Sequence, residues 1–233
     1  MQPTPAAGAV AVIPARGGSK RIPRKNVKAF AGRPMIAYAI QAACQAGVFD
    51  RIVVSTDDEE IAAVAREWGA QVPFVRPAEL ADDHAPTRPV IAHALDSLAV
   101  ADPTPVCCIY PGVPLLQADD IARARLLLSA HAAEFVFPVA AFPSPVQRAL
   151  VREPDGRSRP MQPEHTQTRT QDLQPAFFDV GQFYWALAST WRSGLSIHGH
   201  ARTMVVPEWR SVDIDTPDDW ARAEMLYRAF ASR

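Results

Sequence analysis

The chain has 233 residues, 48% of them hydrophobic, so it can bury one sizeable core as a single domain over residues 1–233. Its 24 basic and 25 acidic residues nearly cancel, which gives no overall charge for attracting nucleic acid or an anionic membrane. No apolar run reaches the roughly 18 to 20 residues of a membrane span, and the N-terminal segment lacks the pattern of a signal peptide. We therefore expect a cytoplasmic protein with a flexible tail over residues 1–8.

A strand over residues 10–14 leads directly into a loop that is rich in glycine and positive charge. The loop combines an adjacent glycine pair, Gly17 and Gly18, with Arg16, Lys20 and Lys25. Glycines adopt backbone angles closed to other residues and let main-chain N–H groups approach an anion, while the cations surround it. A solvated basic loop explains this combination poorly, so the sequence favours a polyphosphate site.

The following segments alternate between helix and strand periodicity. In chain order the predicted elements are a helix from Pro34 to Gly47, a strand over 51–56, a helix over 57–69, a strand over 71–75, a helix over 89–99, a strand over 106–110 and a helix over 119–131. This order predicts an α/β fold with a mostly parallel sheet, helices on both faces, and ligands at the carboxyl ends of the strands. The glycine loop lies at such an end.

From about residue 140 to 185 the pattern changes. Residues 147–152 and 159–161 flank Asp155-Gly156, which is typical of a hairpin turn, and a polar stretch follows over 162–174. Because this excursion lacks an apolar face of its own, we expect it to pack against a second subunit.

Two carboxylates near the C-terminus are candidate Mg²⁺ ligands. If residues 212–215 are extended, Asp213 and Asp215 project from the same face and can share a hard cation; the alternative is a solvated turn. Thr216 as N-cap, Pro217 at the first helical position and Asp219 in a capping box predict that a helix starts immediately afterwards.

Five segments together resemble the cytidylyltransferases that activate nine-carbon acidic sugars, the CMP-sialic acid synthetase family. They are residues 13–26, 55–57, 76–80, 169–172 and 213–215, and they occur in the family's order over essentially the whole chain. Residues 142–149 and 179–185 are most similar to the branch that uses pseudaminic acid. Residues 179–181 read Asp-Val-Gly, where sialic acid enzymes usually show an acidic residue followed by Asn-Gly, so we expect a different acceptor pocket.

The resemblance implies a Rossmann-like fold of the nucleotide-diphospho-sugar transferase type with a small dimerisation excursion. It implies that CTP condenses with a nonulosonic acid, foremost pseudaminic acid and otherwise legionaminic or N-acetylneuraminic acid, to give the CMP-sugar and pyrophosphate. Mg²⁺ would be the cofactor and the protein would be a homodimer.

The resemblance also assigns residue roles by position. The implied nucleotide-binding residues are Ala15, Arg16, Gly17, Gly18, Ser19, Lys25, Asn26, Arg76 and Thr87. The implied catalytic set is Arg16, Lys20, Lys25, Asp213 and Asp215, of which the two aspartates bind the metal. The implied sugar-binding residues are Tyr110, Gln147, Arg148, Arg169, Gln171, Asp179, Gln182, Phe183 and Tyr184, with Arg148 a candidate partner for the sugar carboxylate. No general base is evident, and His198 and His200 are interpreted as surface or core residues.

One departure and two rival functions remain. Residues 110–114 read Tyr-Pro-Gly-Val-Pro, so hydroxyl donors expected there near the sugar are missing. Asp213-Ile214-Asp215 also has the Asp-x-Asp form found in metal-dependent glycosyltransferases, although the basic loop favours nucleotidyl transfer. An RNA-binding module would need aromatic side chains interleaved with the basic residues, and the aromatic residues here cluster far along the chain from the loop.

Overall fold

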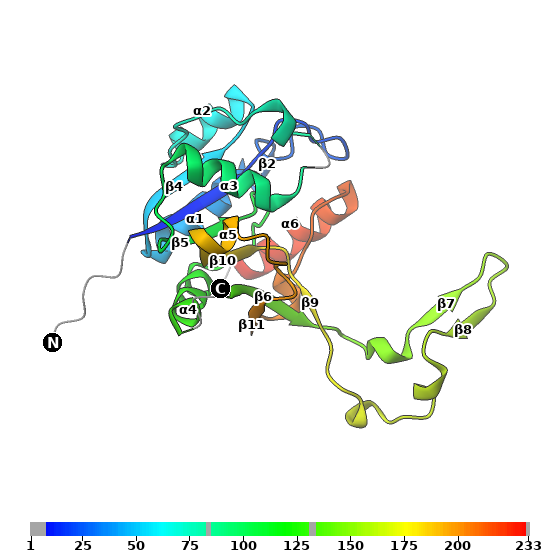
Figure 1. The fold of residues 1–233 in the computed structure, drawn as a ribbon. Coiled ribbons are helices and arrows are strands. Elements are labelled where there is room, and N and C mark those ends of the chain that lie inside the picture. The colour runs from blue at the N-terminus through cyan, green and yellow to red at the C-terminus, as the bar shows by residue number, and fades with distance from the viewer. Residues whose placement is uncertain (1–7, 83–84, 131–133, 232–233) are drawn as a thin grey trace.

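The fold is built on a seven-stranded sheet, and the computed structural model describes residues 8–82, 85–130 and 134–231 (Figure 1). The strands are β1 (Ala9–Pro14), β4 (Phe49–Ser55), β5 (Pro105–Ile109), β6 (Phe135–Ala141), β9 (Phe177–Asp179), β10 (Phe183–Leu187) and β11 (Ala201–Val205). Their order is β11-β6-β10-β5-β1-β4, and β9 also pairs with β6. β1 is parallel to β4 and β5, and β11 is parallel to β6, whereas β10 and β9 run antiparallel to their neighbours. The predicted mostly parallel sheet is confirmed.

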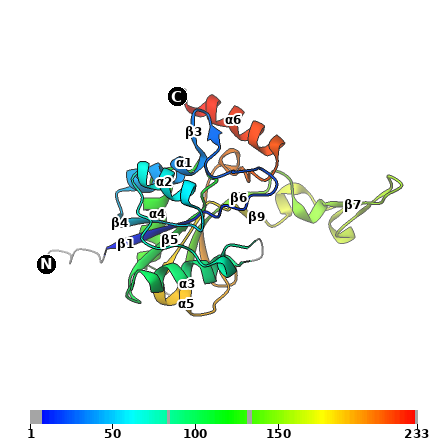
Figure 2. The same cartoon turned by 90° about the horizontal axis from the view of Figure 1, so that it is seen from above.

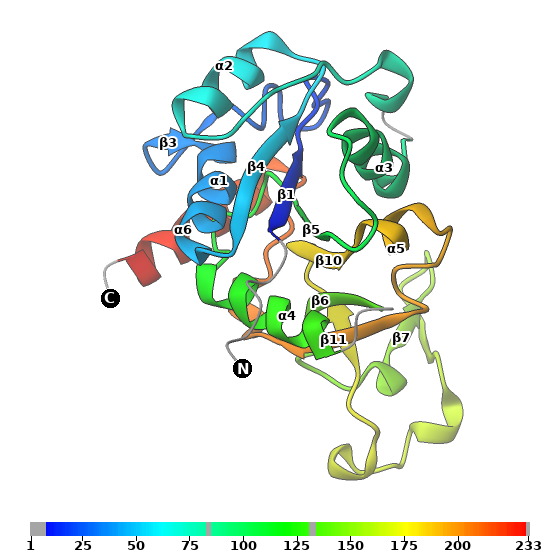
Figure 3. The same ribbon diagram turned by 60° about the vertical axis from the view of Figure 1, so that its left-hand side comes forward.

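Helices cover both faces of this sheet (Figure 3). α1 (Met35–Ala46), α2 (Glu59–Glu67) and α4 (Ala118–Ala130) pack on one face, and α3 (Thr87–Ser97) and α5 (Ala188–Arg192) pack on the other. In β1, Ala11 and Ile13 contact the first layer while Val10 and Val12 contact the second. Because successive strand residues point to opposite faces, β1 is apolar along its whole length and is buried on both sides.

A smaller cluster attaches α6 (Pro217–Ala231) to the hairpin of β2 (Ala29–Phe30) and β3 (Arg33–Pro34). Phe30 is fully buried, and its ring lies 5.5 Å from that of Tyr38 and 5.3 Å from that of Trp220. Ile214, 1% exposed, belongs to the same cluster. This packing brings the segment before α6 alongside the loop that follows β1.

The predicted helices are observed with small shifts at their ends. Pro34 is the N-cap of α1 rather than its first residue, and α3 begins at Thr87, two residues earlier than predicted. Residues 131–133, where the predicted end of α4 falls, lie outside the described part of the chain, as do residues 1–7 of the predicted tail.

The predicted strand over 71–75 is wrong. The segment makes one isolated bridge, between Gln71 and Val53, and then leaves the sheet. Pro73 cannot donate a ladder hydrogen bond, and Val75 is 73% exposed. The sequence analysis also did not predict β6, β9, β10, β11, α5 and the β2–β3 hairpin.

In the structure the excursion is residues 142–176, a narrower range than the predicted 140–185. It extends away from the sheet (Figures 1 and 2). It contains β7 (Leu150–Arg152) and β8 (Ser158–Pro160), joined at the predicted Asp155-Gly156 turn, where Gly156 has φ +90°. Short 3₁₀ turns occupy Val146–Arg148, Pro163–His165 and Thr170–Asp172, and two others, Ala78–Leu80 and Glu208–Arg210, lie in the main body. None of the helices in the described ranges has the length and apolar character needed to cross a membrane.

Candidate active site

A cleft of about 510 Å³ lies at the carboxyl ends of β1 and β5. It gathers predicted residues that are far apart in the sequence, namely Arg16, Ser19, Lys20, Lys25, Asn26, Arg76, Thr87, Tyr110, Asp213 and Asp215. The walls also include residues that the sequence reasoning did not select, among them Arg21, Asp82, Gly112 and Gly181. The fold thus unites the basic loop, residues 15–26, with the two C-terminal carboxylates.

One premise of the prediction for the glycine pair of the basic loop is wrong. Neither Gly17 nor Gly18 has a positive φ, so unusual backbone angles do not explain them. A Cβ on Gly17 would lie 2.7 Å from Asp58 Oδ2, whereas one on Gly18 would meet no atom within 4 Å. The Gly17 N–H donates to Asp57 Oδ1 at 3.0 Å. Gly17 is therefore required by close packing against α2, and its amide binds a carboxylate of this chain.

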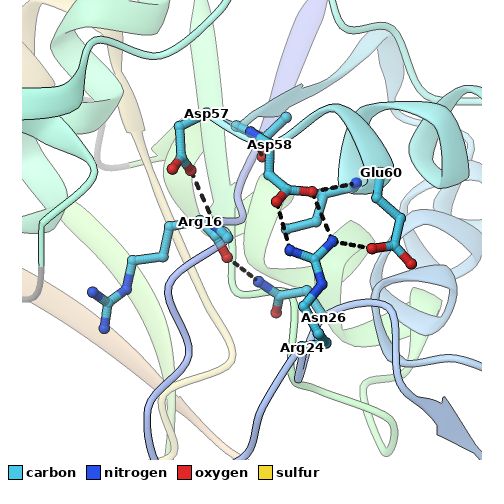
Figure 4. A network of polar contacts seen from close by, with 9 residues as sticks. Arg16, Arg24, Asn26, Asp57, Asp58 and Glu60 are labelled. Carbon is cyan, nitrogen blue, oxygen red and sulfur yellow. Dashed lines mark hydrogen bonds and ion pairs between the residues drawn. The ribbon is translucent and has the colours of Figure 1, made fainter.

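A charged network ties the other end of the basic loop to α2 (Figure 4). Arg24, with φ +56°, donates to both carboxylate oxygens of Asp58, at 2.5 and 2.9 Å, and also to Glu60. Asp58 caps α2 by accepting from Ile61 N at 3.0 Å, and the Arg24 guanidinium lowers the pKa of Asp58 to about 2. Asn26 Nδ2 donates to Arg16 O at 3.0 Å across the loop. The loop is held in shape before any ligand binds.

The side chain of Arg16 points away from this network and lines the cleft (Figure 4). Arg76 lies deeper, at 4% exposure, and its Nε donates to Ser55 Oγ at 3.1 Å. Burial lowers the pKa of Arg76 to about 10, and the nearby Arg16 charge acts in the same direction. A guanidinium that has lost much of its hydration favours an anionic or strongly polar ligand.

The carboxylate pair faces the basic loop across the cleft. Asp213 and Asp215 line the cleft while Ile214 packs into the core, so the predicted alternation is confirmed although no regular strand forms. Arg21 lies 2.8 Å and Lys25 3.7 Å from Asp215 Oδ1. The pKa of Asp213 is raised, first because the cleft walls shield its carboxyl from water and then by the charge of Asp215.

Two adjacent carboxylates, of which Asp215 helps to raise the pKa of Asp213, fit a divalent cation. In the described ranges no cluster of three or more His, Cys, Asp or Glu could hold a metal unaided. A Mg²⁺ ion bound by Asp213 and Asp215 would therefore take its other ligands from phosphate oxygens or water, as Mg²⁺ commonly does. The capping box that follows is confirmed: Asp219 N donates to Thr216 Oγ1 at 3.2 Å, and Thr216 N donates to Asp219 Oδ2 at 2.8 Å.

A second cavity of about 460 Å³ adjoins the cleft, and Thr87 and Tyr110 line both. Their hydroxyl groups lie 2.8 Å apart. Tyr184 also lines the second cavity and donates to Asp179 Oδ2 at 2.7 Å. Burial raises the pKa of Tyr110 to about 12 and also that of Tyr184, so both hydroxyls stay protonated. Three predicted sugar-binding residues thus lie together beside the cleft, namely Tyr110, Asp179 and Tyr184.

The other predicted sugar-binding residues lie elsewhere. Phe183 is fully buried in the core layer under α1 and α4, and Gln182, 4% exposed, donates to Arg210 O at 2.8 Å. Neither lines the cleft or the second cavity, so their positions are those of structural residues. The excursion carries Gln147, Arg148, Arg169 and Gln171, and none of these four lines the cleft or the second cavity of its own chain.

Comparison with known proteins agrees with this geometry. A family model described as Cytidylyltransferase matches residues 10–145. The pseudaminic acid cytidylyltransferase of Campylobacter jejuni is 38% identical over 220 residues, which cover 93% of this chain and 95% of that protein. The CMP-N,N'-diacetyllegionaminic acid synthase of Legionella pneumophila is 34% identical over 229 residues, covering 93% and 95%.

Among solved structures, CMP:2-keto-3-deoxy-manno-octonic acid synthetase complexed with CTP superposes with a TM-score of 0.72 at 19% identity, covering 96% of this chain and 99% of that one. A 4-diphosphocytidyl-2C-methyl-D-erythritol synthase gives 0.66 at 13% identity, covering 95% and 99%. At these identities the structures establish the fold, which is the predicted Rossmann-like one. Taken with the family match and the sequence relatives, they lead to one conclusion: the chain belongs to the cytidylyltransferase family.

Proposed function

We propose that this protein condenses CTP with pseudaminic acid, giving the CMP-sugar and pyrophosphate. The observation that carries the proposal is the cleft in which the basic loop faces Asp213 and Asp215. The choice of acceptor rests on the 38% identity to the Campylobacter jejuni enzyme, whose name states that activity. Legionaminic acid is the next candidate, because the Legionella pneumophila relative is 34% identical over a similar share of the chain.

The reaction requires the anomeric hydroxyl of the sugar to attack the α-phosphorus of CTP in line with the departing pyrophosphate. The enzyme has mainly to orient the two reactants and to offset negative charge that develops on the leaving group. Arg16, Lys20 and Lys25 line the cleft and would bind the triphosphate. Arg76, which is buried in the wall of the same cleft, would also contact the nucleotide.

Asp213 and Asp215 would hold Mg²⁺. When bound, this ion supplies positive charge that neutralises phosphate oxygens and lowers the pKa of a coordinated hydroxyl. The chain's own part is to hold the pair in place: Arg21 and Lys25 lie beside Asp215, and Lys25 also donates to Ile214 O.

We infer that the protein is a homodimer in which the excursion meets the partner subunit. Large apolar side chains are exposed there: Leu150 is 62% and Met161 is 56% exposed, and Phe142 and Phe177, at and just beyond its two ends, are 42% and 46% exposed. Arg148 and Arg169 are remote from the cavities of their own chain. In a dimer they would act on the sugar held by the other subunit.

The decisive experiment measures pyrophosphate release from CTP and Mg²⁺ with pseudaminic acid and N-acetylneuraminic acid as parallel acceptors. Release with pseudaminic acid alone supports the proposal in full. Release only with N-acetylneuraminic acid keeps the reaction and corrects the acceptor. A glycosyltransferase would release no pyrophosphate, so silence with every nonulosonic acid would overturn the proposal.

A further inference from the structure

The wall of the second cavity carries a hydrogen-bonded cluster centred on Asp179. Gly181 N donates to Asp179 Oδ1 at 2.8 Å. Tyr184 Oη and His198 Nε2 both reach Asp179 Oδ2, at 2.7 and 2.8 Å. Gly181 has φ +63°, a conformation that favours glycine, so this turn is built around the carboxylate. The cluster joins β9 and β10 to the segment that precedes β11.

Asp179 determines how the imidazole of His198 is presented. A carboxylate oxygen accepts hydrogen bonds, so His198 Nε2 carries the donated hydrogen, and in this Nε2–H tautomer the Nδ1 atom is an acceptor. The ring of Phe137 packs against the imidazole edge to face, with centroids 5.4 Å apart. His198 is thus held by two contacts although 67% of its side chain is exposed, and it lines the second cavity.

The remaining walls combine apolar surface with a buried hydrogen-bond donor. Pro86, Pro89 and Ile197 contribute apolar surface. Arg88 Nε, buried in the same wall, has no hydrogen-bond partner among the residues that the structure describes. A buried donor without a partner costs about 1 to 3 kcal/mol, which a ligand oxygen would offset. An acylamino group offers this combination, since it has a methyl, a carbonyl acceptor and an N–H donor.

We propose that the second cavity binds an acylamino substituent of the acceptor sugar and that His198, oriented by Asp179, is the specificity-determining residue that accepts a hydrogen bond from it. The inference rests on the proposed function and deepens it, because the shared rim of Thr87 and Tyr110 lets a sugar in the second cavity reach a nucleotide in the cleft. His198 acts on recognition and takes no part in the chemical step.

The test compares His198→Phe with His200→Phe. The first variant keeps a ring for contact with Phe137 but loses the nitrogens; His200, an exposed neighbour outside both cavities, provides the matched control. Each is assayed with the natural acceptor and with an analogue in which one acylamino group is replaced by hydroxyl. We expect His198→Phe to raise the KM for the acylated acceptor about tenfold, the value of one hydrogen bond, with the KM for CTP unchanged. Asp179→Asn should reproduce part of this loss.

The analogue separates recognition from a structural effect. If His198 contacts the acylamino group, the effect of removing that group from the sugar and the effect of removing the imidazole from the enzyme are not additive. His198→Phe then leaves the KM for the analogue that lacks this group nearly unchanged. Equal losses with both acceptors, a parallel rise in the KM for CTP, or behaviour identical to His200→Phe would overturn the inference while the proposed function stands. Absence of pyrophosphate release by the wild-type protein would overturn both.

Discussion

The basic loop and the excursion are both polar segments with little regular structure, but they are held in opposite ways. The basic loop is bound to the α/β core through Asp57 and the Arg24–Asp58 ion pair, and Asn26 braces it internally by donating to Arg16 O. The hydrogen bonds of the excursion are mostly internal, such as Gln147 Nε2 to Gln174 O at 2.8 Å and Arg148 to Thr170 at 3.5 Å. The residues predicted to bind the nucleotide thus gather within one chain, whereas the sugar-binding residues predicted on the excursion lie outside the cleft and the second cavity of that chain.

The strongest test of the self-contained half is Asp213→Asn. Loss of one carboxylate of the pair should lower turnover by about a thousandfold, because charge stabilisation at the phosphates is lost. Pyrophosphate release at saturating CTP measures the effect, and an unchanged thermal midpoint excludes unfolding. Asp218→Asn, in the exposed first turn of α6, is the matched control and should retain full activity. Activity of Asp213→Asn within tenfold of wild type would refute the metal assignment.

Mixed dimers test whether the excursion serves the partner subunit. Arg169→Ala should lower kcat/KM for the sugar by about ten- to a hundredfold, as expected for a lost charged contact. Mixing Arg169→Ala with inactive Asp213→Asn and allowing subunits to exchange should restore about a quarter of the wild-type activity, since half of the dimers are mixed and each has one intact site. If the mixture is no more active than its components, Arg169 acts within its own chain or not at all.

A comparison of Gly17→Ala with Gly18→Ala tests whether contact with Asp58 fixes the position of the basic loop. The new methyl group of Gly17→Ala would lie 2.7 Å from Asp58 Oδ2, so the loop must move away from α2. We expect kcat/KM for CTP to fall about tenfold, in keeping with a small displacement of phosphate donors. Gly18→Ala meets open space and should bind CTP normally. Equal effects of the two substitutions would show that contact with Asp58 does not determine the loop's position.

Asp58→Asn should give the smallest effect, on the free energy of unfolding. Loss of the charged N-cap costs about 1 kcal/mol at pH 7. Because the folded pKa of Asp58 is lowered to about 2, its stabilisation is fully present above the unfolded pKa, about 4, and is lost as the pH falls through the folded value. Urea denaturation at pH 7 and pH 3 should therefore show a smaller difference between wild type and variant at pH 3. A penalty independent of pH would mean that the ion pair with Arg24 contributes nothing.

The parts of the fold that the sequence predicted are those set by local periodicity. β1, β4, β5 and the helices between them follow from repeating apolar patterns, and the Asp213-Ile214-Asp215 alternation correctly predicted two carboxylates in the cleft with a core residue between them. The strand over 71–75 failed because apolar content outweighed the signal from Pro73, which cannot donate to a ladder.

Other parts of the site depend on contacts between distant segments, which local patterns do not contain. His198 meets Asp179 only because the segment before β11 returns beside the end of β9, and Arg24 meets Asp58 although β2, β3, α1 and β4 lie between them in the sequence. One error could have been avoided. Phe183 and Tyr184 are adjacent in a strand and point to opposite faces, so they could not both reach the sugar.

The start of α6 affects how the enzyme loses activity on heating. Asp219 Oδ2 accepts from Thr216 N and also from Asp215 N, at 3.2 Å, so the helix cap fixes the backbone of a residue in the proposed metal-binding pair. This helix lies outside the sheet and is held chiefly by the cluster around Phe30 and Trp220. Fraying of its first turn would release Asp215 while the α/β core stayed folded. Heating should therefore inactivate the enzyme some degrees before it melts, and a ligand that spans the cleft should bring the two temperatures together.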